Sequence, residues 1–226
     1  EKARYGRLSS NGNFQEISFL MILKEVCVDN LNDAINAYKC GANRIEFCSN
    51  LDQDGLTPKM DELLTLSNTI DIPIRCMLRP HSNSFIYDGD DLKKIEDTIS
   101  FCKKIKIDGV VFGSLNNENE IDFDILNYIS IISKPLKLIF HKAIDFTPDF
   151  TKSFKSLIDS KLVDGVLTTG GKEKAIDNLE LLSKISSTIP KDFELIACGN
   201  ITYENYDYIH SIIKSKFYHG KKIIKL

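Results

Sequence analysis

The residues best suited to chemistry lie at alternate positions in two short β-rich runs near the start of the chain. Glu25 and Cys27 fall on one face of the first run, and Arg44, Glu46 and Cys48 fall on one face of the second, because strand side chains alternate between faces. The residues between them are apolar. Carboxylates and a guanidinium on a shared face can move protons or hold a charged ligand, so these five residues are the first candidates for a site.

A third run carries two arginines on one face, Arg75 and Arg79. If the three faces converge on one interior, their charges must be paired. Glu25 and Glu46 facing Arg75 and Arg79 are then the expected neutralising set. Two interpretations stay open for it: a structural ion network in the core, and a polar pocket for an anionic or multi-hydroxyl ligand.

A histidine follows in the fifth run. His141 lies at the carboxyl end of that run, as Arg79 does in the third, and barrel active sites lie at that end of the strands. Imidazole exchanges protons near neutral pH, and Asp145 is placed to orient it. An enzyme acting on a small anionic or phosphorylated substrate would use Glu25, Glu46, Arg79, His141 and Asp145 as its acid–base residues.

Two glycine-containing turns follow later runs. Gly170 and Gly171 come after the sixth run, and Gly199 and Asn200 come after the seventh. Backbone N–H groups ahead of a helix can bind a phosphate or carboxylate, although barrels more often place that site after strands seven and eight. Ordinary turns explain the same glycines, and both interpretations stay open.

Eight β-rich runs alternate with amphipathic helical patterns along the chain. The runs are Ile22–Val28, Arg44–Cys48, Pro73–Arg79, Gly109–Gly113, Leu136–His141, Asp164–Thr168, Phe193–Cys198 and Phe217–Gly220. This alternation predicts βαβ units and a parallel sheet, and eight units fit an α/β fold of the (β/α)8 TIM-barrel type. A doubly wound open sheet is the second choice, because its glycine-rich GxGxxG loop is not found. Only six residues follow Gly220, so we expect the barrel of this chain to lack its final helix.

Composition limits the classes of function. With 42% hydrophobic residues the chain can bury a core, and a formal charge of −3 shows no basic field for nucleic acid. No apolar run is long enough to cross a membrane. We expect residues 1–20 to form an N-terminal extension and residues 21–226 to form one soluble barrel domain.

The cysteines do not follow a known pairing motif. They stand at positions 27, 40, 48, 76, 102 and 198 and form no CxxC pair, which argues against a zinc ribbon or a thioredoxin motif. No secretory segment precedes them, so reduced thiols are expected. We expect Cys40 and Cys102 in the core on helix faces, and Cys76 pointing toward the helices.

Several ordered motifs resemble the CutC family of copper-homeostasis proteins. They are EVCVDNLNDAINAYKCGANRIEFCSNLDQDGLTP at 25–58, MLRP at 77–80, DGVVFGSL at 108–115, FHKAID at 140–145 and LTTGG at 167–171. The resemblance runs from about residue 22 to residue 220. It implies a TIM-type barrel, a cytoplasmic location, a homo-oligomer (dimer or tetramer) and a role in copper binding or trafficking.

The resemblance also assigns residues. The two cysteines proposed for copper in that family match Cys27 and Cys48, and its other polar positions match Arg79, His141 and Asp145. Cu(I) is soft and favours thiolates. Neighbouring strands would bring the two cysteines together, although alternate layers of the barrel could set the sulfurs at different heights.

Three departures from the family pattern are visible. Lys142 stands where the family commonly has arginine, Cys198-Gly199-Asn200 replaces a triple glycine, and the C-terminal helix is absent. The loss of a glycine weakens the phosphate-loop interpretation, because Cys198 restricts the backbone. Three functions therefore stay open: a Cu(I)-binding protein, an enzyme acting on a small anion, and a catalytically silent ligand-binding or scaffold protein. His219 can join the pocket or be structural.

Overall fold

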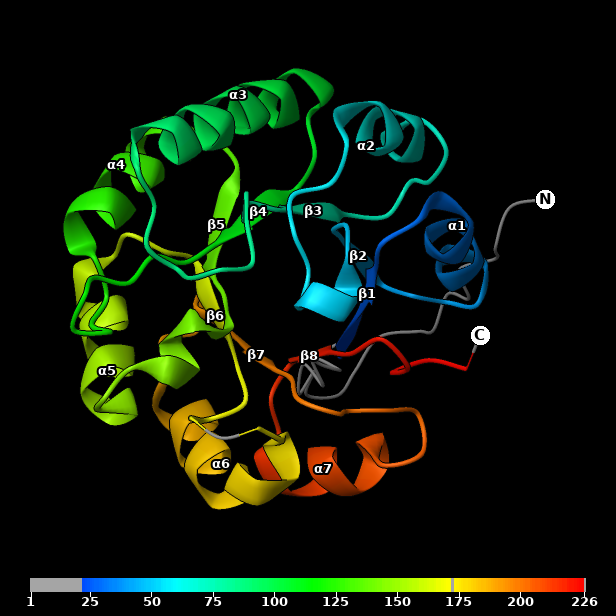
Figure 1. The fold of residues 1–226 in the computed structure, drawn as a ribbon. Helices are drawn as coiled ribbons and strands as arrows, with labels where there is room; N and C mark the ends of the chain where they lie inside the picture. The colour runs from blue at the N-terminus through cyan, green and yellow to red at the C-terminus, as the bar shows by residue number, and fades with distance from the viewer. Residues whose placement is uncertain (1–21, 172, 226) are drawn as a thin grey trace, which may run out of the picture.

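The computed structural model describes residues 22–171 and 173–225, so the predicted extension over residues 1–20 lies outside the described residues. Eight parallel strands close into a barrel in chain order, with β8 paired to β1 (Figure 1). The strands are β1 (Leu23–Val28), β2 (Arg44–Phe47), β3 (Ile74–Met77), β4 (Gly109–Phe112), β5 (Lys137–Phe140), β6 (Gly165–Thr168), β7 (Glu194–Ala197) and β8 (Phe217–His219). The predicted (β/α)8 architecture is confirmed.

Seven α-helices among the described residues cover the outside of the barrel (Figure 1). They are α1 (Leu31–Lys39), α2 (Met60–Ser67), α3 (Gly89–Ile105), α4 (Phe123–Ser133), α5 (Phe150–Ser160), α6 (Leu179–Thr188) and α7 (Tyr206–Ile213). Three short 3₁₀ helices join them, η1 (Leu51–Gln53), η2 (Lys142–Phe146) and η3 (Ala175–Asn178). In the described part of the chain no helix follows β8, as the sequence indicates.

The first helix begins and ends where its local sequence predicts. The side chain of Asn30 accepts a hydrogen bond from the backbone N–H of Asp33 at 2.9 Å, which satisfies one free donor at the helix start. Gly41 follows the helix with φ of 92°, a conformation that glycine adopts without steric cost. The chain is thereby turned back into β2, which carries two of the candidate residues.

Strand alternation divides the apolar residues into two clusters. The outward-facing residues of the strands pack beneath the helices, and Cys76 and Cys102 belong to this cluster as predicted. A smaller cluster lies inside the barrel: Cys27, Cys48, Met77, Val111, Ile139, Leu167, Ile196 and Cys198. Cys40 is exposed at the end of α1, so its predicted place in the core is wrong.

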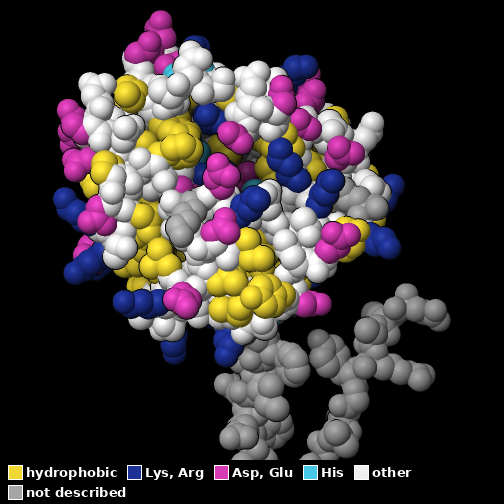
Figure 2. Space-filling model, turned by 60° about the horizontal axis from the view of Figure 1, so that its bottom comes forward, with side chains coloured by type: hydrophobic (Ala, Val, Ile, Leu, Met, Phe, Trp, Pro, Cys, Tyr) yellow, Lys and Arg dark blue, Asp and Glu magenta, His cyan; other side chains and the backbone are white. Residues whose placement is uncertain are grey.

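Charged side chains of both signs lie on the face of the described residues that Figure 2 shows. Among the described residues, none of the helices is long and apolar enough to span a bilayer. Acidic and basic side chains are interspersed over the face that Figure 2 shows. This mixture agrees with the formal charge of −3 for the whole chain.

Candidate functional site

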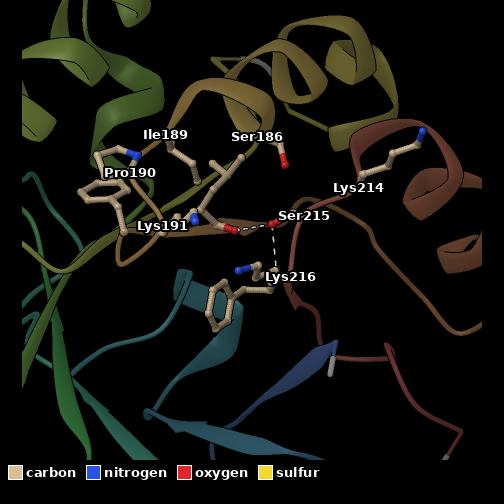
Figure 3. A pocket seen from close by; sticks show the side chains of 10 residues that line it. Ser186, Ile189, Pro190, Lys191, Lys214, Ser215 and Lys216 are labelled. Carbon is tan, nitrogen blue, oxygen red and sulfur yellow. Dashed lines mark hydrogen bonds between the residues drawn. The ribbon is translucent and has the colours of Figure 1, made fainter. Parts of the chain in front are cut away.

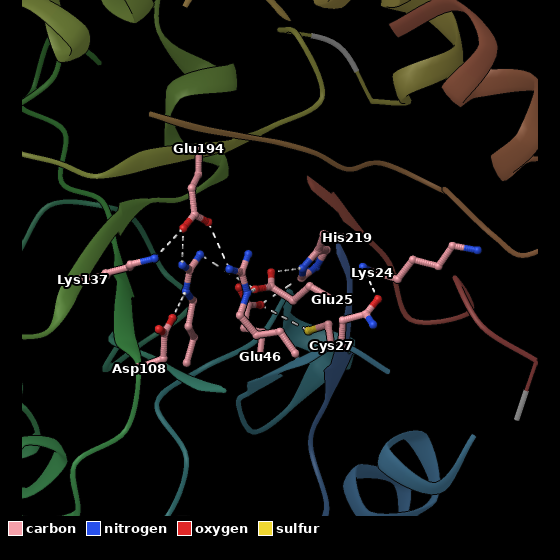
Figure 4. Close-up of polar contacts among 11 residues, drawn as sticks. Lys24, Glu25, Cys27, Glu46, Asp108, Lys137, Glu194 and His219 are labelled. Carbon is pink, nitrogen blue, oxygen red and sulfur yellow. Dashed lines mark hydrogen bonds and ion pairs between the residues drawn. The ribbon is translucent and has the colours of Figure 1, made fainter. Parts of the chain in front are cut away.

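A buried ion network fills the part of the barrel nearest the strands' amino ends (Figure 4). Glu194 is its centre: its carboxylate accepts from Arg44 Nη1 at 3.0 Å and from Arg75 Nη2 at 2.9 Å. Arg44 Nε also donates to Glu25. The remaining partners are Asp108, 3.0 Å from Arg75 Nε, and Lys137, 3.0 Å from Glu194.

The charges of this network compensate one another. Burial would raise the pKa of Glu194, but Arg75 and Arg44 outweigh it and hold that pKa below its usual range. Burial would likewise raise the pKa of Glu25, and Arg44 and His219 lower it far more. Both carboxylates are therefore ionised and paired, as a stable core requires. Because residues at the amino ends of barrel strands serve stability, we assign this network to structure.

The expected pairing of Arg79 with the glutamates is wrong. Arg79 lies two residues beyond the end of β3, and its guanidinium donates to the backbone carbonyl oxygens of Gln53 at 2.9 Å and Ser82 at 3.3 Å. Of the predicted pairs only Arg75 and Glu25 approach each other, at 3.9 Å, and Arg44 is the nearer partner of Glu25. Among the described residues Glu46 pairs with no arginine, and His219 Nε2 lies 4.0 Å from its Oε1. Arg75 and Arg79 thus belong to different levels of the barrel.

The two predicted cysteines meet at the carboxyl side of this network. Cys27 Sγ and Cys48 Sγ are 3.7 Å apart, and both side chains are buried. In the strand register Cys27 stands opposite Glu46, and Cys48 lies two residues further along. Although the two residues belong to different layers of the barrel, the sulfur atoms are therefore in contact.

Two further groups that could bind a metal ion, the Glu46 carboxylate and the His219 imidazole, lie close to Cys27. Its thiol donates to Glu46 Oε1 at 3.3 Å, and one ligand atom from each of Cys27, Glu46 and His219 lies within 4.8 Å of the other two. His219 comes from β8, and its Nδ1 is 2.8 Å from Glu25 Oε1 (Figure 4). The hydrogen bond to Cys48, then burial and Glu46, raise the pKa of the Cys27 thiol. Three strands thus supply one thiol–carboxylate–imidazole cluster.

Arg79 and His141 lie together at the carboxyl ends of β3 and β5. The ring of Phe85 connects them: Arg79 Cζ is 4.9 Å from its centre, and the centres of the Phe85 and His141 rings are 5.1 Å apart. The sequence therefore identifies a true spatial pair here. Tyr87, Phe85 and the loop that carries them were not expected at this place.

Gly113 makes room for His141. A Cβ atom on Gly113 would lie 2.4 Å from His141 Nδ1 and 2.6 Å from Cε1, which no packed interior tolerates. We expect Gly113→Ala to lower the free energy of unfolding by about 1–3 kcal/mol and to move the His141 ring signals in an NMR spectrum. Urea denaturation measures the first effect. Gly89→Ala is the control, because nothing lies within 4 Å of its added Cβ, and equal stability of the two variants would contradict the close approach.

Asp145 does not orient His141. It lies on η2, and its carboxylate accepts from the backbone N–H groups of Thr169 at 3.0 Å and Gly171 at 2.8 Å. The Thr168 hydroxyl donates to it as well. Burial raises the pKa of Asp145, although these hydrogen bonds oppose the shift. In this arrangement Asp145 already accepts from part of the predicted anion loop.

The remaining residues of the predicted anion site form tight turns. Gly170 and Gly199 have φ of 87° and 98°, and a Cβ on Gly199 would lie 2.7 Å from Thr169 Cγ2. Asn200 also has positive φ, and its carbonyl accepts from the Asn205 side chain at 2.8 Å. Close packing between the β6 and β7 loops explains the glycine at 199.

A groove at the opposite end of the barrel is not part of this site. It lies where the chain enters β7 and β8, between the end of α6 and the end of α7 (Figure 3). Lys191, Lys214 and Lys216 are among its lining residues. Barrel sites lie at the strands' carboxyl ends, so its position argues against catalysis.

Sequence reasoning missed Glu194, the centre of the ion network. The signal was present, because Glu194 has the same strand parity as the inward-facing Ile196 and Cys198. Its place at the start of a run, next to exposed residues, concealed it. His219 was named only as a lone histidine, and the register of β8 against β1 brings it to Glu25.

Comparisons with known proteins agree with the geometry. The model of the CutC family matches residues 22–224. The copper homeostasis protein cutC homolog of Homo sapiens is 32% identical over 187 residues, covering 83% of this chain and 68% of that protein. The Drosophila melanogaster homolog is 31% identical over 213 residues, covering 92% and 80%.

Solved structures show the same fold. The CutC structure from Streptococcus agalactiae superimposes with a TM-score of 0.83 at 29% identity, covering 90% of this chain and 100% of that one. Phosphoribosyl anthranilate isomerase from Thermotoga maritima gives a TM-score of 0.58 at 11% identity, covering 88% and 87%, which is likeness of fold alone. With a family model over nearly the whole described barrel, the chain belongs to the CutC family.

Proposed function

We propose that this chain is a copper homeostasis protein that binds Cu(I) through Cys27 and Cys48. The observation that carries the proposal is the contact of the two sulfurs, 3.7 Å apart inside the barrel. Cysteine thiolates are soft ligands that select Cu(I). Two of them at this separation need only a small displacement to accept an ion between them. The names of the human and fly relatives support copper homeostasis as the setting.

The surroundings of the two thiols suit a Cu(I) ion. Both sulfurs belong to the apolar cluster inside the barrel, which includes Met77 and Val111 and keeps bulk water away. A ring nitrogen of His219 lies within 4.8 Å of Cys27 Sγ, and imidazole is a ligand type that also suits copper. Its Nδ1 lies 2.8 Å from Glu25 Oε1, so the carboxylate orients the ring, as carboxylates that hydrogen-bond to metal-bound histidines do.

Anaerobic titration with Cu(I) against a competing chelator tests the proposal. We expect one ion per chain, and we expect the Cys27→Ser/Cys48→Ser double variant to lose this binding by at least about a hundredfold, because oxygen ligands are poor partners for Cu(I). Circular dichroism should show an unchanged fold, since serine is close to cysteine in size.

Two single variants are matched controls for the titration. Cys40→Ser removes an exposed thiol, and Cys198→Ser removes a buried thiol of the same interior cluster. Both should bind Cu(I) as the unmodified protein does. Full affinity in the double variant, or equal losses in all variants, would contradict a site at Cys27 and Cys48. The cytoplasmic location and the homo-oligomer stay predictions, and size-exclusion chromatography with light scattering measures the latter.

A further inference from the structure

Arg79 is a buried cation without a counter-ion among the described residues. Arg79 is only 7% exposed, yet no carboxylate of the described chain lies within 4.0 Å of its guanidinium. The other two arginines buried in the described part of the chain, Arg44 and Arg75, each contact at least two carboxylates. A buried charge is costly unless it is paired. Arg79 is therefore built for an anion that is not part of the described chain.

The backbone holds the Arg79 guanidinium but leaves its Nε–H unused. Three carbonyl oxygens accept from its terminal nitrogens, those of Gln53, Gly55 and Ser82, at 2.9 to 3.5 Å. Its Nε–H is buried and has no hydrogen-bond partner. Carbonyl oxygens orient the guanidinium without neutralising it. The arrangement fixes a positive group in place with its Nε–H still available.

His141 presents a second unused donor nearby. Its Nδ1 accepts from the backbone N–H of Ala143 at 3.2 Å, so in the neutral ring the proton resides on Nε2. That Nε2–H is buried and has no partner. Burial and then Arg79 lower the pKa of His141 to about 3, which keeps the ring neutral. The hydroxyl of Tyr87 is likewise buried without a partner.

We propose that Arg79 and His141 bind the carboxylate group of a small molecule at the carboxyl ends of β3 and β5. The unused groups are donors, which calls for a ligand that accepts hydrogen bonds. One buried positive charge matches a carboxylate, whereas a phosphate dianion would leave negative charge uncompensated in the interior. This ligand site does not use Cys27 or Cys48, so carboxylate binding can be tested independently of copper binding.

Phe85 covers the two donors. Its ring lies against both Arg79 and His141, and its other neighbour is Phe146, 5.6 Å away between ring centres and 61% exposed. The carboxylate reaches the buried N–H groups only when Phe85 swings aside. The loop of residues 80–88, between β3 and α3, thus serves as the cover of the site.

Titration of the copper-free full chain with sodium acetate, propionate and succinate at pH 7 tests the proposal, with sodium chloride and inorganic phosphate as comparison salts. NMR signals of the His141 ring nitrogens and of the Arg79 Nε–H report on the site directly. We expect saturable shifts with the carboxylates and only small, linear shifts with chloride. The Cys27→Ser/Cys48→Ser variant should respond as the unmodified protein does.

Two variants locate the binding. Arg79→Met should weaken carboxylate binding by at least about tenfold, the loss expected for one charge-assisted hydrogen bond. The variant should still fold, because no carboxylate of the described chain loses its partner and only the carbonyl oxygens of Gln53, Gly55 and Ser82 lose a donor. Phe85→Ala keeps both donors and removes the cover, so it should bind carboxylates at least as tightly and exchange them faster.

Three results would overturn the proposal. Linear responses that do not differ between acetate and chloride, in the unmodified protein and in Phe85→Ala alike, would mean that water satisfies Arg79. Saturation by phosphate but by no carboxylate would assign the site to a different anion. Unchanged binding in a folded Arg79→Met variant would place the ligand elsewhere.

Discussion

Glu194→Gln is expected to lower the free energy of unfolding by about 3–5 kcal/mol, the usual loss when one partner of a buried ion network is removed. Glu194 accepts from two buried guanidiniums and from Lys137. Glutamine keeps the size of the side chain but not its charge. Arg44 and Arg75 would then share Glu25, with Asp108 near Arg75 alone. Urea denaturation at pH 7 measures the effect.

The control for this prediction is an ion pair on the surface. Asp97 receives Lys93 at 3.0 Å, with side chains 58% and 66% exposed, and exposed pairs contribute little. Asp97→Asn should change the free energy of unfolding by less than about 0.5 kcal/mol. A loss below about 1 kcal/mol in Glu194→Gln would mean that water or Glu25 compensates the arginines, and the structural role assigned to the network would be wrong.

The barrel could be predicted from the sequence because its signals are local. The first two strand runs alternate apolar residues with polar or thiol residues, and all but the last of the eight runs are followed by a helical pattern, so Glu25, Cys27, Arg44 and Glu46 could be assigned to the interior without coordinates. The same rule placed Cys27 and Cys48 in the interior, and the resemblance to the CutC family selected them as a pair. What alternation cannot supply is the height of a side chain in the barrel.

Arg79 illustrates this limit. It has the same parity as Arg75, but it lies four residues further on, which is roughly 13 Å along an extended strand. That distance separates the ion network from the loops at the carboxyl ends. The partners at each level depend on the register between strands, such as Glu46 opposite Arg75. Register is a tertiary property, and the sequence does not reveal it.

Asp145 illustrates a second limit. Its position four residues after His141 suggested a contact between the two, but the chain turns into η2 immediately after β5. The 3₁₀ turn directs the carboxylate toward the Thr169–Gly171 backbone rather than toward the imidazole. A family motif indicates which residues recur, but the contacts of each residue depend on the local backbone conformation.

The largest effect of pH on stability between pH 3 and 6.5 should come from His141. Burial, then Arg79, and more weakly Lys142 lower its pKa from 6.5 to about 3, whereas in the unfolded chain it titrates near 6.5. Between about pH 3 and pH 6.5, His141 is therefore protonated in the unfolded state and neutral in the folded state. The contribution of His141 to the free energy of unfolding is fully present above about pH 6.5 and is lost as pH falls toward 3. The loss is roughly 1.4 kcal/mol for each pH unit well below 6.5.

Two measurements check this expectation. The ring nitrogen signals of His141 should show no titration between pH 7 and pH 4.5. The slope of unfolding free energy against pH should be shallower in His141→Gln, whatever the absolute stability of that variant, because glutamine cannot take up the proton. A ring that titrates near pH 6.5 would mean that water reaches Nε2 beneath Phe85, and the same result would remove the dry, donor-lined setting on which carboxylate binding at Arg79 depends.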